Sequence, residues 1–177
     1  MHKDKEPKQG KTLLQDALEL LRFTVIVLII VIPIRMLIAQ PFIVNGESMI
    51  PTFKNGDYLI IDEISYRFNQ PERGEVIVFR LPTNQKRFLI KRIIGLPGET
   101  VVINGSHINI TKKDNTVVQL EEDYLGDNLS SFGYGTWELK ANEYFMMGDN
   151  RNNSSDSRAW GVLKRDLIIG KTFLRLF

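Results

Sequence analysis

The sequence contains no cysteine and two histidines among its 177 residues. The absence of cysteine excludes a thiol nucleophile, disulfide bonds, a thiolate zinc site and a cysteine-bound iron–sulfur cluster. Two histidines are too few for a three-histidine metal site. We therefore expect no metal and no cofactor, and any catalysis must use a hydroxyl, a carboxylate, an amine or a single imidazole.

Positive and negative charges are nearly balanced, with 23 Lys and Arg against 21 Asp and Glu and a net charge of +2. The chain therefore has no general electrostatic attraction to nucleic acid, and we predict no nucleic-acid partner. A hydrophobic content of 43% and a charged content of 25% are typical of a folded protein. The length suits one ordinary domain and one additional element.

The longest apolar run covers residues 23–39 and is interrupted only by Thr24, Pro33 and Arg35. As a helix it would be about 25 Å long, slightly short of the ~30 Å hydrocarbon core of a bilayer unless flanking arginines reach the interfaces. The run has no polar stripe, so we predict a transmembrane anchor, with a buried core helix as the alternative. A cleaved secretory peptide fits less well, because Leu37 stands where cleavage requires a small side chain.

The predicted orientation follows from the basic residues near the two ends of this run. Five precede it, namely Lys3, Lys5, Lys8, Lys11 and Arg22, whereas Lys54 alone follows shortly after it. Because basic flanks stay on the cytoplasmic side, we predict a cytoplasmic tail over residues 1–22, an anchor over 23–39 and an extracytoplasmic domain over 40–177. The protein would then be a single-pass protein of the cell membrane.

The chain after Pro41 consists of short β-branched or aromatic runs separated by turn residues, which is typical of strands. These runs are residues 58–64, 75–80, 88–94, 100–103, 107–110, 117–120, 144–147 and 168–174. The pair Asn104 and Gly105 between two of them predicts a tight hairpin. The expected fold class is mostly β, with an all-β domain after the single N-terminal helix, and with residues 130–135 as a surface loop.

Two residues in separate segments could form a nucleophile and its base. Ser48 lies before an Ile-Pro turn, where an isolated serine is more typical of a turn residue. Lys91 shares one face of its strand with Leu89 and Ile93, and burial among apolar side chains lowers a lysine pKa toward that of a usable base. An edge-strand lysine is the alternative, and since Arg92 has aliphatic neighbours on the other face, the pattern does not say which cation is buried.

The densest polar cluster covers residues 148–158 and is closed by Trp160. A solvated loop would be ordinary for this composition, but the mixture of acids, arginines and hydroxyls predicts an ordered network. An acid/base pair of Asp149 and Asp156 is the weaker alternative. Nearby Arg151 and Arg158 would keep both carboxylates ionised.

Four segments in this order resemble motifs of the bacterial type I signal peptidases, peptidase family S26, in their small Gram-positive form. They are the serine motif at residues 48–52, an RGD-type strand at 73–79, the lysine motif at 91–98 and a GDNR…SxDSR motif at 148–158. The resemblance implies a signal-peptidase/LexA-like β domain. It also implies a Ser/Lys dyad endopeptidase that removes signal peptides at the outer face of the cytoplasmic membrane.

The resemblance also assigns roles to single residues. It makes Ser48 the nucleophile, Lys91 the general base and Ser154 the residue that orients the lysine. Gly46 stands where Gram-negative members carry a serine that helps form the oxyanion hole, so the second donor must be a main-chain group or a water.

The remaining residues carried by the resemblance are Asp149, Asp156 and Arg158, which it makes structural supports of the site. The implied partners are secretory preproteins with small residues at the cleavage site, together with membrane lipid. Four apolar residues flank the serine and either fill the core or face lipid: Ile43, Met49, Ile50 and Phe53.

Three other functions stay open at the level of sequence. A Ser-Lys autoprotease resembling the LexA repressor family shares the dyad but gives no reason for an anchor. A Ser-His hydrolase would use His107, which follows a turn at the start of a strand. A membrane-tethered β domain would bind peptides by strand addition without cleaving them.

Overall fold

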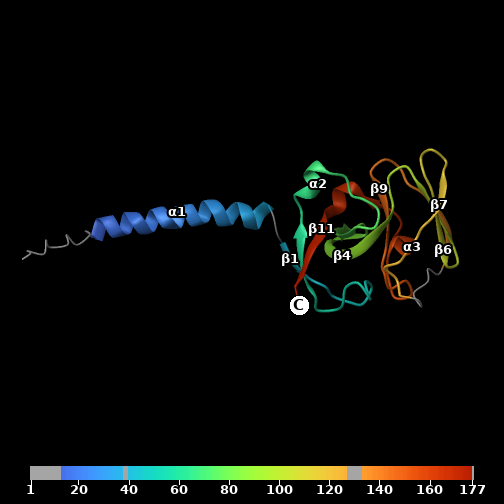
Figure 1. Ribbon diagram of the computed structural model, residues 1–177, viewed down its shortest axis with the longest axis horizontal. Helices are drawn as coiled ribbons and strands as arrows, with labels where there is room; N and C mark the ends of the chain where they lie inside the picture. Colours follow the sequence, from blue (N-terminus) through green and yellow to red (C-terminus); the bar gives the residue numbers. More distant parts are fainter. Residues whose placement is uncertain (1–12, 38–39, 127–132, 177) are drawn as a thin grey trace, which may run out of the picture. The chain divides into compact units, whose positions relative to one another are not determined.

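The structure is a computed structural model that describes residues 13–37, 40–126 and 133–176 (Figure 1). It divides into two compact units, Met1–Leu37 and Ile38–Phe177.

The first unit contains one long helix, α1, over Leu13–Leu37. The side chains of residues 13–32 are exposed along the whole of this stretch. The helix includes residues 23–37 of the predicted anchor, whereas Ile38 and Ala39 lie outside the described residues. Within the part of the chain that the structure describes, no helix meets both the length and the apolarity needed to cross a membrane.

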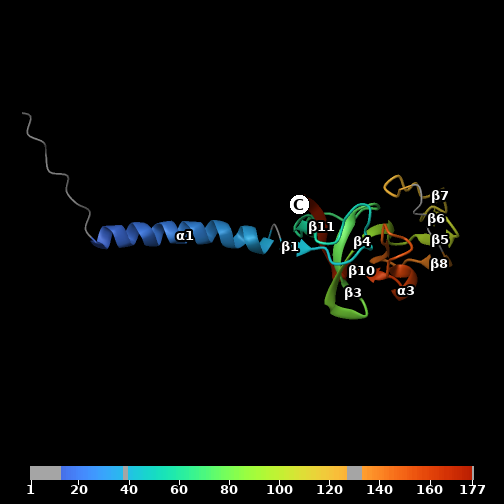
Figure 2. The ribbon, with the colours of Figure 1, turned by 90° about the horizontal axis from the view of Figure 1, so that it is seen from below.

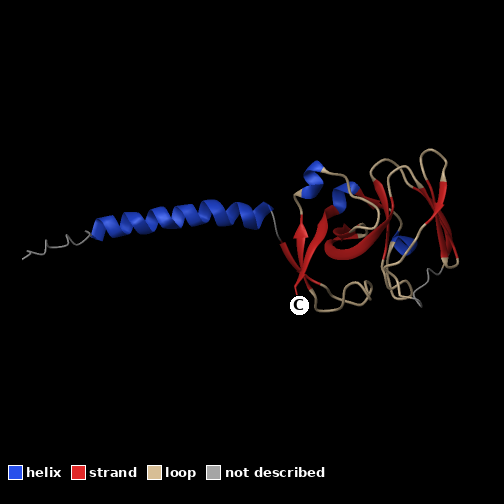
Figure 3. Cartoon of the chain, viewed as in Figure 1, coloured by secondary structure: helices blue, strands red, loops and turns tan. Residues whose placement is uncertain are grey.

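The second unit is mostly β, as the sequence predicted (Figure 3). Its larger sheet has seven antiparallel strands in the order β1-β2-β11-β3-β4-β9-β10. Their bounds are β1 Gln40–Ile43, β2 Tyr58–Asp62, β3 Val76–Leu81, β4 Asn84–Gly95, β9 Glu143–Met147, β10 Leu163–Lys164 and β11 Ile168–Leu176. The C-terminal strand therefore pairs with strands from the first half of the domain.

The smaller sheet has four strands in the order β7-β6-β5-β8, gathered at one end of the unit (Figure 2). Their bounds are β5 Thr100–Asn104, β6 His107–Thr111, β7 Val117–Gln119 and β8 Tyr134–Glu138. The predicted hairpin is confirmed, since Asn104 pairs with His107 across the β5–β6 turn. Gly105 in this turn has a φ of 61°, a conformation that favours glycine.

Helical structure in the second unit is short. It consists of α2 over Ser65–Phe68, α3 over Ser157–Trp160 and the 3₁₀ turn η1 over Arg165–Leu167. These elements connect strands and leave the mostly β description intact.

All eight predicted strand runs are strands, but three further strands were not predicted. These are β1, β8 and β10. The prediction of a surface loop over residues 130–135 was wrong at its end, because Tyr134 and Gly135 begin β8 and pair with β5. Residues 130–132 of that prediction lie outside the described residues.

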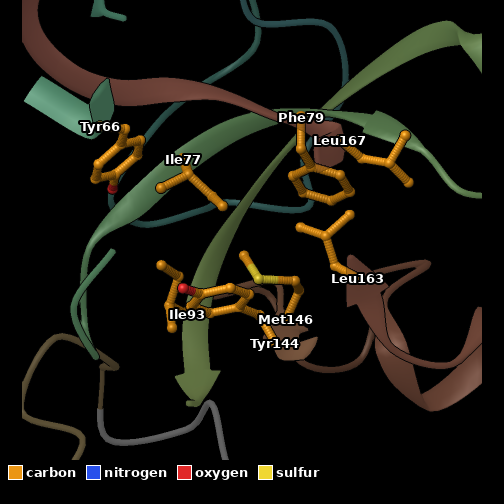
Figure 4. Packing of buried hydrophobic residues seen from close by; sticks show 8 residues of the cluster. All are labelled: Tyr66, Ile77, Phe79, Ile93, Tyr144, Met146, Leu163 and Leu167. Carbon is orange, nitrogen blue, oxygen red and sulfur yellow. The ribbon is translucent and has the colours of Figure 1, made fainter. Parts of the chain in front are cut away.

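Two hydrophobic clusters share the strands β4 and β9. Figure 4 shows the first, formed by Tyr66, Ile77, Phe79, Ile93, Tyr144, Met146, Leu163 and Leu167. The second is formed by Ile94, Val101, Ile103, Ile108, Ile110, Leu139, Phe145 and Met147. Because side chains alternate along a strand, Tyr144 and Met146 enter the first cluster and Phe145 and Met147 enter the second. The paired strands β4 and β9 therefore contribute side chains to both hydrophobic clusters, one on each face of the pair.

Candidate active site

Ser48 lies in the connection between β1 and β2 and is half-buried. The next residue, Met49, is fully buried, and Phe53 is 9% exposed. Both belong to a third hydrophobic cluster beneath this connection, together with Val44, Leu59, Ile61, Val76 and Val78. Burying a methionine side chain contributes about 1.5–3 kcal/mol. Met49 and Phe53 therefore fill the core and fix the position of the serine, whereas Ile43 remains 51% exposed.

Lys91, in the middle of β4, is 2% exposed. Its Nζ donates hydrogen bonds to Ser48 Oγ at 2.6 Å and to the carbonyl of Ile90 at 2.9 Å. Burial lowers the pKa of Lys91 from 10.5 to about 8, although the charges of Asp156 and Asp149 oppose the shift. No carboxylate among the described residues forms an ion pair with this amine.

Arg92 points to the opposite face of β4 and is also buried, at 8% exposure. Its Nε and Nη2 donate to the two carboxylate oxygens of Asp149 at 2.8 and 2.6 Å. Thr52, close to the serine, donates its hydroxyl to the same carboxylate. The strand of Lys91, the serine segment and the polar cluster are thus joined through one fully buried aspartate. Lys91 and Arg92 are thus both buried, which the pattern alone did not decide.

A second ion pair lies within the polar cluster itself. Arg158 Nε and Nη2 each donate to Asp156 at 2.8 Å. Arg151 instead donates to Glu122 at 2.9 Å. The expectation that Arg158 faces a carboxylate of the cluster is confirmed, whereas the partner of Asp149 is Arg92 in place of Arg151. Since each aspartate has its own guanidinium, the arrangement does not favour an acid/base pair that shares a proton.

Gly148 allows the polar cluster to approach the serine closely. A Cβ on Gly148 would lie 2.2 Å from Ser154 Oγ and 2.4 Å from the carbonyl oxygen of Ser48. That carbonyl accepts a hydrogen bond from the N–H of Asn150 at 3.0 Å. Ser154 Oγ is buried and has no hydrogen-bond partner among the described residues, so the structure contains no Ser154–Lys91 hydrogen bond.

Two residues at the site were not expected from the sequence. Tyr124 places its ring 3.9 Å from the guanidinium carbon of Arg92. Its hydroxyl donates to Glu122 at 2.7 Å, and Glu122 in turn pairs with Arg151. Glu122 and Tyr124, in the connection between β7 and β8, therefore contact Arg151 and Arg92 respectively. Nothing in the composition of residues 112–136 distinguished these two residues.

Two hollows border the Ser48–Lys91 pair. The first, the apolar hollow, has a volume of about 310 Å³, and most of its lining residues are of apolar type: Phe42, Ile43, Val44, Asn45, Leu59, Val78, Phe88, Leu89 and Ile90 line it in addition to the pair. The second, the polar hollow, has a volume of about 550 Å³, and most of its lining residues are of polar type: Asn45, Gly46, Glu47, Asn55, Leu89, Asn153 and Ser155 line it in addition to the pair. An extended peptide could therefore reach Ser48 Oγ with chain on both sides of the attacked bond.

His107 is not part of this site. It is exposed at the start of β6 in the smaller sheet, and its Nδ1 lies 3.2 Å from Gln119 Nε2. The geometry therefore gives no support to a Ser-His hydrolase. Within the described residues, no group of three or more histidine or carboxylate side chains is arranged to hold a metal ion.

Comparison with known proteins gives one consistent family. The family model of signal peptidase, peptidase S26, matches residues 17–177. A probable signal peptidase I-2 of Synechocystis sp. is 39% identical over 166 residues, which are 90% of this chain and 73% of that protein. A signal peptidase I of Leptolyngbya laminosa is 38% identical over 157 residues, which are 84% of this chain and 74% of that protein. Signal peptidase IB of Staphylococcus aureus is 31% identical over 180 residues, 92% of this chain and 91% of that protein.

A solved structure also aligns with part of the chain. The crystal structure of a signal peptidase I from Enterococcus faecalis V583 is 31% identical to it, with a TM-score of 0.49. The alignment covers 58% of this chain and 97% of that chain.

Proposed function

The chain belongs to the signal peptidase family, peptidase S26, and we propose that it is a membrane-bound serine endopeptidase that cleaves signal peptides from secreted preproteins. Ser48 is the nucleophile and Lys91 the general base. The observation that carries this proposal is the 2.6 Å contact between Ser48 Oγ and the Nζ of a buried lysine that has no carboxylate partner among the residues that the structure describes.

The chemistry follows from the protonation state of the amine. Neutral Lys91 accepts the hydroxyl proton while Ser48 Oγ attacks the scissile carbonyl carbon. The resulting ammonium then protonates the leaving amine as the C–N bond breaks, which leaves an acyl-enzyme. Lys91 next takes a proton from water, whose oxygen attacks the ester, and the proton returns to Ser48 as the acid product leaves.

We assign supporting roles to the polar cluster. The buried hydroxyl of Ser154 has no hydrogen-bond partner in the described part of the chain and lies against Gly148 beside the serine segment, which supports a role in orienting Lys91. Asp149 joins the strand of Lys91 to the serine segment through Arg92 and Thr52. Asp156 and Arg158 hold the cluster together by their ion pair.

The two hollows suggest how a preprotein would lie. Signal peptides present small residues before the cleavage site, and the apolar hollow lined by Ile43 and Ile90 suits them. The polar hollow lined by Glu47 and Asn153 would then receive the first residues of the mature chain.

The location of the protein is part of the proposal. The apolar run at residues 23–39, most of which is helical in α1, would be a single-pass anchor in lipid. The basic residues before it favour a cytoplasmic tail over residues 1–22. Residues 40–177 would then form the extracytoplasmic catalytic domain, where secreted preproteins emerge.

Incubation of the full-length protein in detergent with a purified preprotein tests the activity. N-terminal sequencing of the product should place a single cut after the signal peptide. Ser48→Ala and Lys91→Ala should each abolish cleavage, whereas His107→Ala should leave the rate unchanged. If Ser48→Ala kept full function, the domain would be a peptide binder. If the protein cut only itself, it would be an autoprotease of the LexA type.

A further inference from the structure

The polar hollow contains a side-chain amide to which the mechanism above gives no role. Asn55 lines this hollow together with Gly46, Ser48 and Lys91. Asn55 Oδ1 accepts a hydrogen bond from the main-chain N–H of Gly46 at 2.8 Å. Because an N–H can only donate, the atom that faces it must be the amide oxygen, which fixes the orientation of the side chain. The Nδ2 of Asn55 then points away from Gly46, and no acceptor binds it among the described residues.

Attack by Ser48 creates a negative oxygen that needs donors held in place beforehand. Within the described residues, the N–H of Ser48 has no acceptor and is available as one donor. Gly46 offers no second donor, because it has no side chain and its N–H is already bound to Asn55. Its φ of 105° also makes a larger residue strained at this position. The N–H of Ile50 is already in use as well, because it donates to the carbonyl of Glu47 at 3.2 Å.

We propose that Asn55 Nδ2 is the second donor to the oxyanion, in place of the main-chain group or water that the sequence led us to expect. The carboxamide acts as a bridge, with Oδ1 anchored on the N–H of Gly46 and Nδ2 directed at the oxygen of the tetrahedral intermediate. Anchoring matters because a donor that is already oriented loses little freedom when the charge appears. This inference rests on the proposed function, since it concerns the intermediate that forms at Ser48.

The other polar side chains of this hollow are less suited to the role. Asn153 uses its Nδ2 as a donor to Glu47 Oε2 at 3.5 Å. Asn45, Ser155 and Asn55 are all exposed, but Asn45 and Ser155 make no side-chain hydrogen bond within the described part of the chain, so nothing fixes their direction. Of the asparagines in the hollow, Asn55 alone combines a fixed orientation with an unused donor.

A comparison of Asn55→Asp with Asn55→Ala separates anchoring from donation. Aspartate keeps an oxygen for the N–H of Gly46 but replaces Nδ2 by a second oxygen, whereas alanine removes both groups. If Asn55 donates to the oxyanion, both variants should lose about 10²–10³-fold in kcat, with a much smaller change in KM. The rates are compared at the high-pH plateau, because a new carboxylate in the hollow raises the pKa of Lys91.

Asn84→Asp is the matched control. Asn84 is exposed at the start of β4, and its Oδ1 also accepts a main-chain N–H, that of Lys86 at 3.2 Å. This variant should keep the wild-type kcat, which would show that the loss at position 55 is not a general effect of adding a carboxylate. Thermal unfolding of each variant shows which variants are folded. If Asn55→Ala is unfolded, Asn55→Asp decides the outcome, because aspartate preserves the side-chain shape and the hydrogen bond to the N–H of Gly46.

Two results would overturn the inference. A near-normal kcat for Asn55→Asp would mean that Asn55 serves only to hold Gly46. A loss confined to Asn45→Ala, with both Asn55 variants active, would move the role to Asn45. Ser48→Ala in the same assay keeps the two proposals apart, because its continued activity would refute the serine peptidase itself.

Discussion

Lys91 and Arg92 are neighbours in β4 and are both buried, but Arg92 forms a bidentate ion pair with Asp149, whereas Lys91 has no carboxylate partner within the described residues. A buried cation without a partner is costly, and part of that cost is relieved when the group loses its proton. The fold therefore favours the neutral amine at position 91 and the charged guanidinium at position 92. One strand thus presents a base on one face and a structural ion pair on the other.

The cost of burying Lys91 predicts a pH-dependent gain in stability for Lys91→Met. Because folding lowers the pKa from 10.5 to about 8, the wild type is destabilised by roughly 3 kcal/mol below pH 8, where both states carry the proton. Between about pH 8 and 10.5 the unfolded chain holds more protons than the folded one, so wild-type stability rises with pH. The advantage of Lys91→Met in denaturant unfolding should be largest at pH 7 and should shrink between about pH 8 and 10.5.

Lys171→Met is the control for this measurement. Lys171 is paired with Glu75 at 2.9 Å, and this hydrogen bond raises its pKa. Its replacement should bring no gain in stability at pH 7. A gain for Lys91→Met that did not change with pH would contradict the assignment of a lowered pKa to Lys91.

Ser154→Ala should lower kcat with little effect on KM and without loss of thermal stability. The buried hydroxyl has no hydrogen-bond partner among the described residues, so its removal breaks no hydrogen bond that the structure shows. Ser157→Ala should behave in the opposite way, since Ser157 Oγ accepts the buried N–H of Met146 at 2.9 Å. Leaving that N–H unpaired costs about 1–3 kcal/mol. Steady-state kinetics and melting curves check both, and a change mainly in KM for Ser154→Ala would make Ser154 a substrate contact.

Gly148→Ala should reduce kcat by at least about tenfold and destabilise the fold by about 1–3 kcal/mol. The added methyl group would overlap Ser154 Oγ and the carbonyl oxygen of Ser48, so one of them must move. Gly126→Ala is the matched control, because a Cβ there meets no atom of the described residues within 4 Å. Equal activity of the two variants, measured on the same preprotein, would show that the close approach at Gly148 is not needed.

The proposed topology predicts the result of protease treatment of intact cells. Protease added from outside should digest the domain at residues 40–177 and spare an epitope tag placed before residue 22, because basic residues keep that end inside. Permeabilised cells provide the control in which the tag is also lost. Loss of the tag from intact cells would reverse the orientation.

Much of the site could be predicted from local sequence because its residues lie in motifs. The alternation of β4 placed Lys91 on one face with Leu89 and Ile93. Ser48 was singled out by the resemblance of residues 48–52 to the serine motif, because the Ile-Pro turn alone favoured an ordinary turn residue. Their partners could not be predicted in the same way, since the contact between Arg92 and Asp149 joins residues far apart in the chain. Tyr124 and Asn55 carried no local signal, because their roles depend on which main-chain and guanidinium groups the fold brings beside them.

The strands that were missed have a similar explanation. β8 is Tyr134–Glu138, in which Gly135 and Thr136 dilute the apolar alternation, and it exists through its pairing with β5. β1 begins at Gln40 next to Pro41 and pairs on one side only, with β2. Strand propensity is weak at such edges, and tertiary pairing decides.

The pH dependence of kcat/KM for preprotein cleavage tests the central claim most directly. If neutral Lys91 is the base, the rate should rise about tenfold per pH unit below about pH 8 and level off above it. Lys91→Arg should be inactive at every pH, because a guanidinium does not lose its proton in this range. A wild-type rate that is independent of pH between 6 and 10, or a Lys91→Arg variant with near-normal kcat, would contradict the Ser48–Lys91 dyad.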